Sequence, residues 1–329
     1  MQSGSALILL AGFCQGSFML PTKGMRHWGW ENYWLIFAIT AYLVAPWLLA
    51  VTTIPHLFHV YSGASAGTLV AVAAFGMGWG AGALTFGLGV DALGLALGFA
   101  VILGTSAVFG AIVPLIAFPQ KSFTSSQLMV LVISLIVMVA GVFICSLAGR
   151  WKDAERANRQ SYARGLSLCI LSGLLSSCGN LGFVFGSEIT ARAEAAGVTP
   201  SVAPNAVWTL LMLPLFVCNA GYALYLMWRN STASHYRDEA ALRPIVLSVL
   251  MGVLWMAGFA FYGMGATRLG ALGPSLGWAM MMATIVLVAN GLGIVTGEWI
   301  EAPARSRRQL FAGVLVLFCA ILGLGYANG

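Results

Sequence analysis

The feature that most constrains this chain is a long run without charge. Between Glu31 and Asp91 lie 59 residues that include no Asp, Glu, Lys or Arg. An α-helix needs about 20 apolar residues to cross the hydrocarbon core of a bilayer, so this run is long enough for more than two crossings. Because 60% of the chain is hydrophobic and only 8% is charged, a water-soluble globular enzyme is excluded. The sequence predicts a polytopic membrane protein.

The apolar runs are typical of helices rather than of a membrane β-barrel. Barrel strands alternate polar and apolar residues over about ten positions, whereas the runs in this chain are long and unbroken. The 40 glycines favour the same conclusion, since glycine lets packed membrane helices approach one another closely. We therefore expect an all-α integral membrane protein, whose helices satisfy their own backbone hydrogen bonds.

Division of the chain at charges, prolines and polar clusters gives ten apolar spans. We expect the first span to be a membrane helix rather than a cleaved signal peptide, because no Lys or Arg precedes it. The polar segments 149–164 and 229–243 are too short to form domains, so function must reside inside the helix bundle. The ten spans are 4–22, 34–54, 66–87, 92–117, 127–148, 165–187, 205–228, 244–264, 272–296 and 309–327.

An internal repeat relates the third span to the eighth at a constant offset of 176 residues. Five helices separate the two copies, and an odd number of crossings inverts the second unit relative to the first. We therefore predict ten transmembrane helices arranged as two inverted five-helix repeats, residues 1–150 and 151–329, as in many secondary transporters. The first copy contains Gly76, Trp79, Gly82, Phe86, Gly87, Gly89, Leu93 and Gly94, which match Gly252, Trp255, Gly258, Tyr262, Gly263, Gly265, Leu269 and Gly270.

The basic residues predict the orientation of the chain. Thirteen of the sixteen Lys and Arg residues fall in the connections that follow odd-numbered spans. By the positive-inside rule these connections are cytoplasmic, and both termini lie on the outer side of a bacterial inner membrane. The net charge of +6 is then mainly a topology signal, so we expect the lipid bilayer and no nucleic acid as a partner. A monomer or a homodimer is consistent with the sequence.

No cofactor, metal site or enzyme motif is expected. All six cysteines lie in apolar segments without a CxxC pair, and no HExxH pattern is present. The four histidines fall in predicted loops. Glycine-rich strings such as 87–89 lack the strand, turn and lysine of a phosphate-binding loop.

Ionisable residues are absent from the middle of the spans and occur only at their ends. Such residues usually anchor helix ends at the membrane surface. Asp91 is the most interesting of them, because it is the lone acid between Glu31 and Asp153 and falls in a short predicted connection. If transport is coupled to protons, we expect Asp91 to carry the proton. The four residues at span ends are Lys23, Asp91, Glu188 and Glu298.

Neutral polar and aromatic residues within the spans are the candidates for substrate binding. An indole face can pack on the C–H face of a pyranose, and amide or hydroxyl groups can bind its hydroxyls. Ordinary packing and hydrogen bonding between helices is the competing interpretation for each of them. The candidates are Gln15, Ser17, Trp79, Asn180, Trp255, Tyr262 and Trp278, with Asn219 and Asn290 as further polar residues inside the spans.

Five segments of the chain form a recognisable pattern: Lys23 to Trp34 (KGMRHWGWENYW), those around Trp79 and Trp255, Gly277-Trp278-Ala-Met-Met-Met282 and Gly297-Glu298-Trp299. In these segments the sequence resembles the bacterial L-rhamnose/proton symporter family of the drug/metabolite transporter superfamily. The resemblance extends almost from end to end. It implies a ten-helix inverted-repeat transporter of the inner membrane that takes up a small sugar, typically a 6-deoxyhexose, together with a proton.

The chain also departs from that family's pattern, and these differences keep alternatives open. One alternative is an exporter or exchanger of another small metabolite without proton coupling. A membrane-embedded enzyme or sensor is a further one, although the sequence offers no cluster of ionisable groups at one depth. The resemblance implies Asn where this chain has Ala83 and Thr85, Gln at Gly258, Asp at Pro274, His at Met281 and Arg at Asp91.

Overall fold

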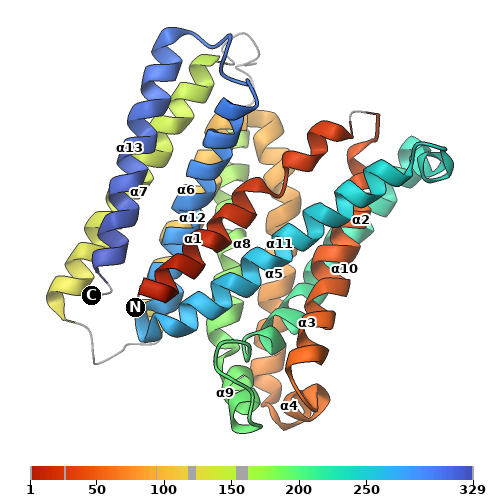
Figure 1. Cartoon of the computed structure of the whole chain (residues 1–329), viewed down its shortest axis with the longest axis vertical. Coiled ribbons are helices and arrows are strands. Elements are labelled where there is room, and N and C mark those ends of the chain that lie inside the picture. The colour runs from red at the N-terminus through yellow and green to blue at the C-terminus, as the bar shows by residue number, and fades with distance from the viewer. Residues whose placement is uncertain (1, 26, 94, 118–123, 153–161, 328–329) are drawn as a thin grey trace.

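The computed structural model describes residues 2–25, 27–93, 95–117, 124–152 and 162–327 as a bundle of helices, with no strand in these ranges (Figure 1). Nine helical segments in the described part of the chain are long and apolar enough to cross a membrane. The predicted all-α, multi-pass membrane class is therefore confirmed.

The first half of the chain contains a long helix that is widened in the middle. Pro46 has no N–H and its ring would clash with the carbonyl four residues earlier, and a π-helical stretch precedes it. This half contains α1 (Gln2–Ser17), η1 (Leu20–Gly24), α2 (Trp30–Ala38), η2 (Ile39–Val44), α3 (Ala45–Thr53), α4 (Leu57–Gly63), α5 (Ala66–Leu93), α6 (Leu95–Ala117) and α7 (Ser125–Lys152).

The predicted connection between the third and fourth spans is almost absent. Helix α5 continues to Leu93 and α6 begins at Leu95, so Asp91 lies in the last turn of a helix and not in a loop. No proline stops the helix earlier, and glycines do not end a helix in a lipid environment. The side chain of Asp91 lies outside the described part of the structure. His59, also predicted in a loop, belongs to α4.

The second half follows the predicted spans closely. The predicted span that is not among the nine long apolar segments is the fourth, 92–117, where α6 contributes the shorter apolar stretch Val101–Ala117. This half contains α8 (Tyr162–Phe185), α9 (Ser187–Ala195), α10 (Asn205–Asn230), η5 (Thr232–Arg237), α11 (Leu242–Arg268), η6 (Gly270–Leu272), α12 (Gly273–Val295) and α13 (Ala304–Tyr326).

Helices α5 and α11 each pack on several other helices of the bundle. Helix α5 packs on α8 and α10, and α11 packs on α1 and on the α2–η2 helix. Helices α6 and α12 pack on α8 and α1, respectively, and on each other. Helices α7 and α13 lie side by side at one edge (Figure 1). Their close approach depends on Gly141 and Gly313, because a Cβ there would lie within 3 Å of Leu317 or Cys145.

Candidate functional site

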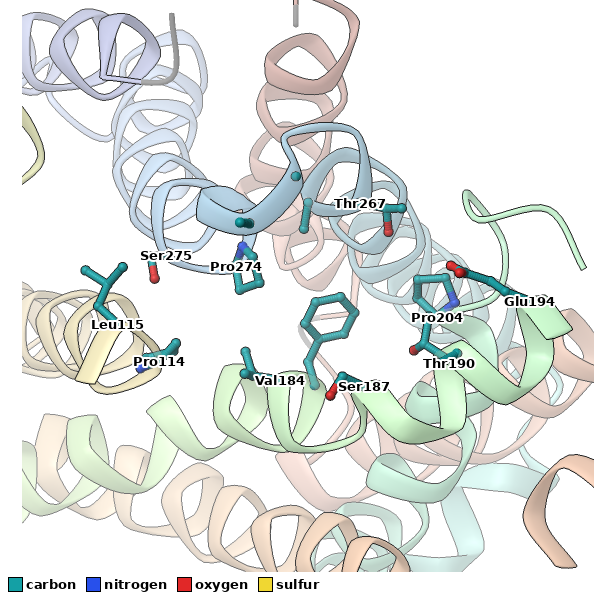
Figure 2. A pocket seen from close by; sticks show the side chains of 15 residues that line it. Pro114, Leu115, Val184, Ser187, Thr190, Glu194, Pro204, Thr267, Pro274 and Ser275 are labelled. Carbon is teal, nitrogen blue, oxygen red and sulfur yellow. The ribbon is translucent and has the colours of Figure 1, made fainter. Parts of the chain in front are cut away.

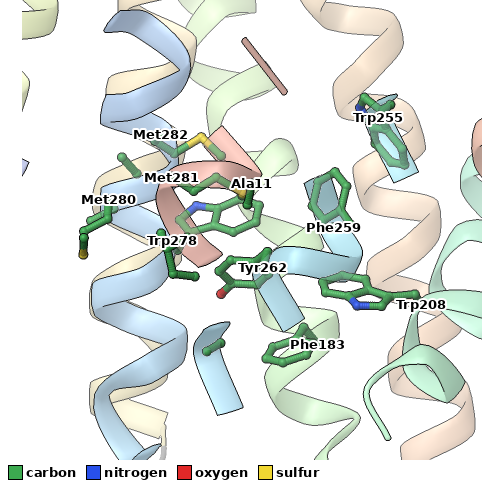
Figure 3. Close-up of a cluster of buried hydrophobic side chains, with 14 of the residues drawn as sticks. Ala11, Phe183, Trp208, Trp255, Phe259, Tyr262, Trp278, Met280, Met281 and Met282 are labelled. Atoms are coloured by element: carbon green, nitrogen blue, oxygen red, sulfur yellow. The ribbon is translucent and has the colours of Figure 1, made fainter. Parts of the chain in front are cut away.

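Seven aromatic side chains form a continuous cluster inside the bundle; Figure 3 labels all of them except Trp79. They come from five helices, α5, α8, α10, α11 and α12. All are at most 9% exposed. We call this set the aromatic cluster; its members are Trp79, Phe183, Trp208, Trp255, Phe259, Tyr262 and Trp278.

Helix α11 contributes three of the seven rings of the cluster. Trp255, Phe259 and Tyr262 are spaced by four and three residues, which places them on one face of the helix. Trp79 of α5 packs against this face, with ring centroids 5.5 Å from Trp255 and 5.0 Å from Phe259. The two tryptophans that match in the internal repeat are thus in contact with each other.

The other end of the cluster reaches α8, α10 and α12. The ring of Trp208 is stacked on Phe183 at a centroid distance of 4.9 Å and an interplanar angle of 13°. Tyr262 packs edge to face on Phe183 and on Trp278, at 5.5 and 5.6 Å. Such aromatic contacts stabilise beyond their burial, by about 0.5–1.5 kcal/mol per pair.

Asn180 is the centre of a buried hydrogen-bond network beside the aromatic cluster. Its Nδ2 donates to the carbonyls of Gly110 (2.7 Å) and Pro274 (3.0 Å). The Tyr262 hydroxyl donates to Asn180 Oδ1 and also lies 3.1 Å from the Pro274 carbonyl. Pro114 explains one of these bonds: it has no N–H to offer the carbonyl of Gly110 within α6, so the Asn180 amide bonds to that carbonyl instead.

Three of the indoles pack against a glycine of a neighbouring helix. A Cβ at Gly179 would lie 3.0 Å from the Trp79 ring, and one at Gly110 only 2.4 Å from Trp278 Nε1. A Cβ at Gly263 would lie 3.0 Å from Trp208 Nε1. Glycine at these positions makes the space that the rings occupy.

Two more of the predicted site residues belong to α1. Gln15 is buried, and its Nε2 donates to the carbonyl of Trp255 (2.7 Å), which joins α1 to α11 next to the aromatic cluster. Ser17 does not join the network, since its hydroxyl bonds to the carbonyls of Phe13 and Cys14 in its own helix.

The two further polar residues within the spans make helix contacts only. Asn219 accepts from Trp34 Nε1 and donates to Leu215 O, and Asn290 donates to Val286 O. The aromatic cluster, Asn180 and Gln15 therefore bring together six of the seven predicted binding residues: Gln15, Trp79, Asn180, Trp255, Tyr262 and Trp278.

A cavity of about 340 Å³ adjoins the aromatic cluster (Figure 2). This volume is in the range of sites for small molecules. It opens where α6, α8 and α11 end and where α10 and α12 begin. Phe183 and Pro274 line the cavity and also belong to the cluster and to the Asn180 network. The lining combines Ser187, Thr190, Glu194, Thr267 and Ser275 with Pro114, Leu115, Phe183, Val184, Ala191, Pro204, Ala266, Gly270, Ala271 and Pro274.

The sequence does not predict the cavity residues or three members of the cluster, Phe183, Trp208 and Phe259. Prolines give a signal that could have located the cavity: Pro114, Pro204 and Pro274 all lie near the ends of spans that meet there. The cavity contains four hydroxyl side chains and one carboxylate, Glu194, among its lining residues. This composition suits a small hydroxylated ligand without negative charge.

The opposite end of the bundle is held by polar contacts between the two halves of the chain. Glu31 is buried at the start of α2 and accepts from Asn230 Nδ2 (3.0 Å) and Thr232 Oγ1 (2.8 Å), at the end of α10. Nearby, the Lys23 ammonium lies 2.6 Å from the Glu298 carboxylate. Burial raises the pKa of the Tyr236 hydroxyl, which donates to the Asn32 carbonyl.

Three of the four charges predicted at span ends have ordinary anchoring partners. Lys23 and Glu298 are both partly exposed and paired. Glu188 accepts from the backbone N–H and hydroxyl of Ser65 and pairs with Arg192 at 3.3 Å. Within the described ranges, no group of three His, Cys, Asp or Glu residues lies close enough together to hold a metal ion.

Comparison with known proteins agrees with this architecture. The family model described as L-rhamnose-proton symport protein (RhaT) matches residues 4–328. Proteins named L-rhamnose-proton symporter are similar over 97% of this chain and 96% of their own length: those of Klebsiella pneumoniae and Cronobacter sakazakii are 28% identical, and that of Escherichia coli is 27% identical. This is a family of transporters and not of enzymes, which confirms that expectation. The chain belongs to the L-rhamnose-proton symport protein (RhaT) family.

Proposed function

We propose that this protein is a secondary transporter that takes up a small neutral sugar of the L-rhamnose type together with a proton, by alternating access. The observation that carries the proposal is the cavity that adjoins a buried aromatic cluster and its Asn180 network. Aromatic faces and uncharged polar groups are the surfaces that bind a sugar ring and its hydroxyls. The names of the relatives, L-rhamnose-proton symporter, support the same substrate class.

The proposed architecture is a ten-crossing bundle of two inverted repeats, residues 1–150 and 151–329. The packing pattern supports it, because contacts recur when each span is exchanged for the one five spans away. Helix α5 packs on α8 as α11 packs on α1, α6 on α8 as α12 on α1, and α6 on α7 as α12 on α13. Two such units that rock against each other expose a central site to either side in turn.

The proposed orientation places the basic connections in the cytoplasm and both termini outside, in a bacterial inner membrane. The cavity lies among connections that follow even-numbered spans, so in this orientation it faces the outer side. The contacts of Glu31 and Lys23 lie at the cytoplasmic end and join the two halves there. Such an arrangement suits a transporter that is open outward and closed inward.

Proton coupling is proposed to involve Asp91, in the last turn of α5. A carboxylate near the end of a central helix can bind and release a proton as the two repeats move. The alternative without proton coupling is exchange of another metabolite. It is favoured by the residues that depart from the family pattern, among them Gly258, Pro274 and Met281.

Reconstitution in liposomes tests the proposal. We expect saturable uptake of labelled L-rhamnose that is accelerated by an inward proton gradient, and we expect Asp91→Asn to abolish the acceleration while counterflow persists. Counterflow in the wild-type protein without any response to the gradient would favour the exchanger. Lack of saturable transport over a wide panel of sugars would contradict sugar transport itself.

A further inference from the structure

One hydrogen-bond donor of the aromatic cluster has no acceptor. Trp208 is fully buried, and its Nε1 has no hydrogen-bond partner among the residues that the structure describes. The other indoles with recorded bonds do have acceptors: Trp278 Nε1 donates to the Ser106 carbonyl and Trp34 Nε1 to Asn219 Oδ1. Because buried tryptophan N–H groups are usually paired, an unpaired one inside a candidate binding site points to a ligand acceptor.

The unpaired N–H lies one layer of side chains from the cavity. Nε1 lies against Gly263, since a Cβ there would be 3.0 Å from Nε1, and the same Cβ would be 3.1 Å from Pro204 Cβ. Pro204 lines the cavity. Phe183 lines it as well and stacks on the face of Trp208 (Figure 3). Phe183 and Pro204 therefore contact both the cavity and the surroundings of the indole, and a ligand must displace side chains there to reach Nε1.

Within the Asn180 network, Asn180 and Tyr262 have no donors left to offer. Both hydrogens of Asn180 Nδ2 are used by the carbonyls of Gly110 and Pro274, and the hydrogen of the Tyr262 hydroxyl is used by Asn180. What this network retains is lone pairs on Asn180 Oδ1 and on the Tyr262 oxygen. A sugar needs both kinds of partner, because each hydroxyl donates one hydrogen bond and accepts others.

We propose that Trp208 is a substrate-binding residue, whose indole N–H donates a hydrogen bond to one hydroxyl of the transported sugar. This inference rests on the proposed function. It makes Trp208 a donor beside the Asn180 network, in which Asn180 and Tyr262 can act as acceptors. The bonded hydroxyl then becomes a determinant of specificity, since a sugar that lacks it leaves the indole N–H unpaired.

The test replaces only the donor. Benzothienylalanine incorporated in place of Trp208 keeps the shape of the ring and replaces N–H by sulfur. We expect the Kd for L-rhamnose to rise about 3- to 10-fold, the usual value of one hydrogen bond between neutral groups. In the wild-type protein, one of the 2-, 3- or 4-deoxy analogues of L-rhamnose should bind more weakly by a similar factor, and the variant should no longer distinguish that analogue from L-rhamnose. The same replacement at Trp228, an exposed residue of α10, is the matched control.

A second measurement follows the indole N–H of Trp208 by NMR in the wild-type protein, so it does not require a variant to bind sugar. In protein labelled with ¹⁵N-tryptophan, the indole signal that disappears in Trp208→Phe belongs to Trp208, and L-rhamnose should move its N–H proton downfield. If the wild-type protein binds L-rhamnose while the benzothienyl variant binds it equally well and this signal does not move, the role of Trp208 is refuted and sugar transport stands. If the wild-type protein binds no sugar of the panel, the proposed function fails and the assignment of Trp208 fails with it.

Discussion

The segments 76–87 in α5 and 252–263 in α11 have the same pattern of glycines and aromatics but different surroundings. Their first aromatic residues, Trp79 and Trp255, pack against each other. Their second aromatic residues differ: Phe86 packs edge to face on Phe99, whereas Tyr262 is fully buried and bonded to Asn180. The shared pattern therefore specifies close packing, and a single hydroxyl makes the second copy part of a polar site.

The largest effect is expected at the second aromatic position, where α11 has a tyrosine hydroxyl and α5 has none. Tyr262→Phe gives α11 the apolar ring of α5 and removes the hydroxyl that satisfies Asn180 Oδ1. We expect the free energy of unfolding to fall by about 1–3 kcal/mol and uptake of L-rhamnose to fall at least tenfold. Thermal unfolding in detergent and proteoliposome uptake measure the two effects.

The reciprocal change Phe86→Tyr is the control for this prediction. Phe86 is partly exposed, so its added hydroxyl displaces no buried partner, and we expect a change within about 0.5 kcal/mol. Equal effects of the two substitutions would contradict the assignment of the polar role to α11.

Gly87 and Gly263 follow the second aromatic residues, and they differ in the space available for an added methyl group. In Gly263→Ala the new Cβ would lie 3.0 Å from Trp208 Nε1 and 3.1 Å from Pro204, within a fully packed region. We expect a loss of about 1–2 kcal/mol from overpacking. In Gly87→Ala the Cβ meets nothing within 4 Å, and we expect no loss of stability. Unfolding midpoints of the two variants compared side by side decide the matter, and the prediction fails if Gly87→Ala is the more harmful.

The contact that the two segments share should show a coupling. Trp79→Phe and Trp255→Phe each remove part of the same ring contact, so the double variant should lose less stability than the sum of the single variants. A double-mutant cycle is expected to give a coupling of about 0.5–1.5 kcal/mol. A coupling of zero would indicate that the two rings pack independently.

The smallest effect is expected at Ser17. Its hydroxyl bonds only to carbonyls of its own helix, so Ser17→Ala should change stability and L-rhamnose affinity within about 0.5 kcal/mol. Loss of binding in this variant, measured by thermal shift with added sugar, would indicate that Ser17 does take part in substrate binding.

The sequence is sufficient for the membrane class, and it selects several residues that the structure brings together around the aromatic cluster. Polar side chains such as Asn180 and Gln15 are costly against lipid, so they had to face other helices. The matched position of Trp79 and Trp255 in the internal repeat placed both inside the bundle. These arguments depend on chemistry that only one environment can satisfy.

The same arguments do not locate Trp208, Phe183 or the cavity. In a membrane helix the face toward lipid is as apolar as the face toward its neighbours, so periodicity does not separate them. Trp208 also lies near the start of its span, where tryptophan is common at a membrane surface. Asp91 was placed in a loop because charge was taken as a boundary, whereas the α5 backbone continues past it.

The pairing of indole rings with glycines has a mechanical consequence. Trp79 on Gly179 and Trp278 on Gly110 each join a helix of the first half of the chain to one of the second. A flat ring on a glycine has no neighbouring Cβ with which to interlock, so a small shift along the interface changes the overlap of the surfaces without forcing a new rotamer. Separation of the same surfaces loses their buried area. These ring–glycine contacts therefore resist separation more than they resist sliding, which favours shear between the two halves of the chain.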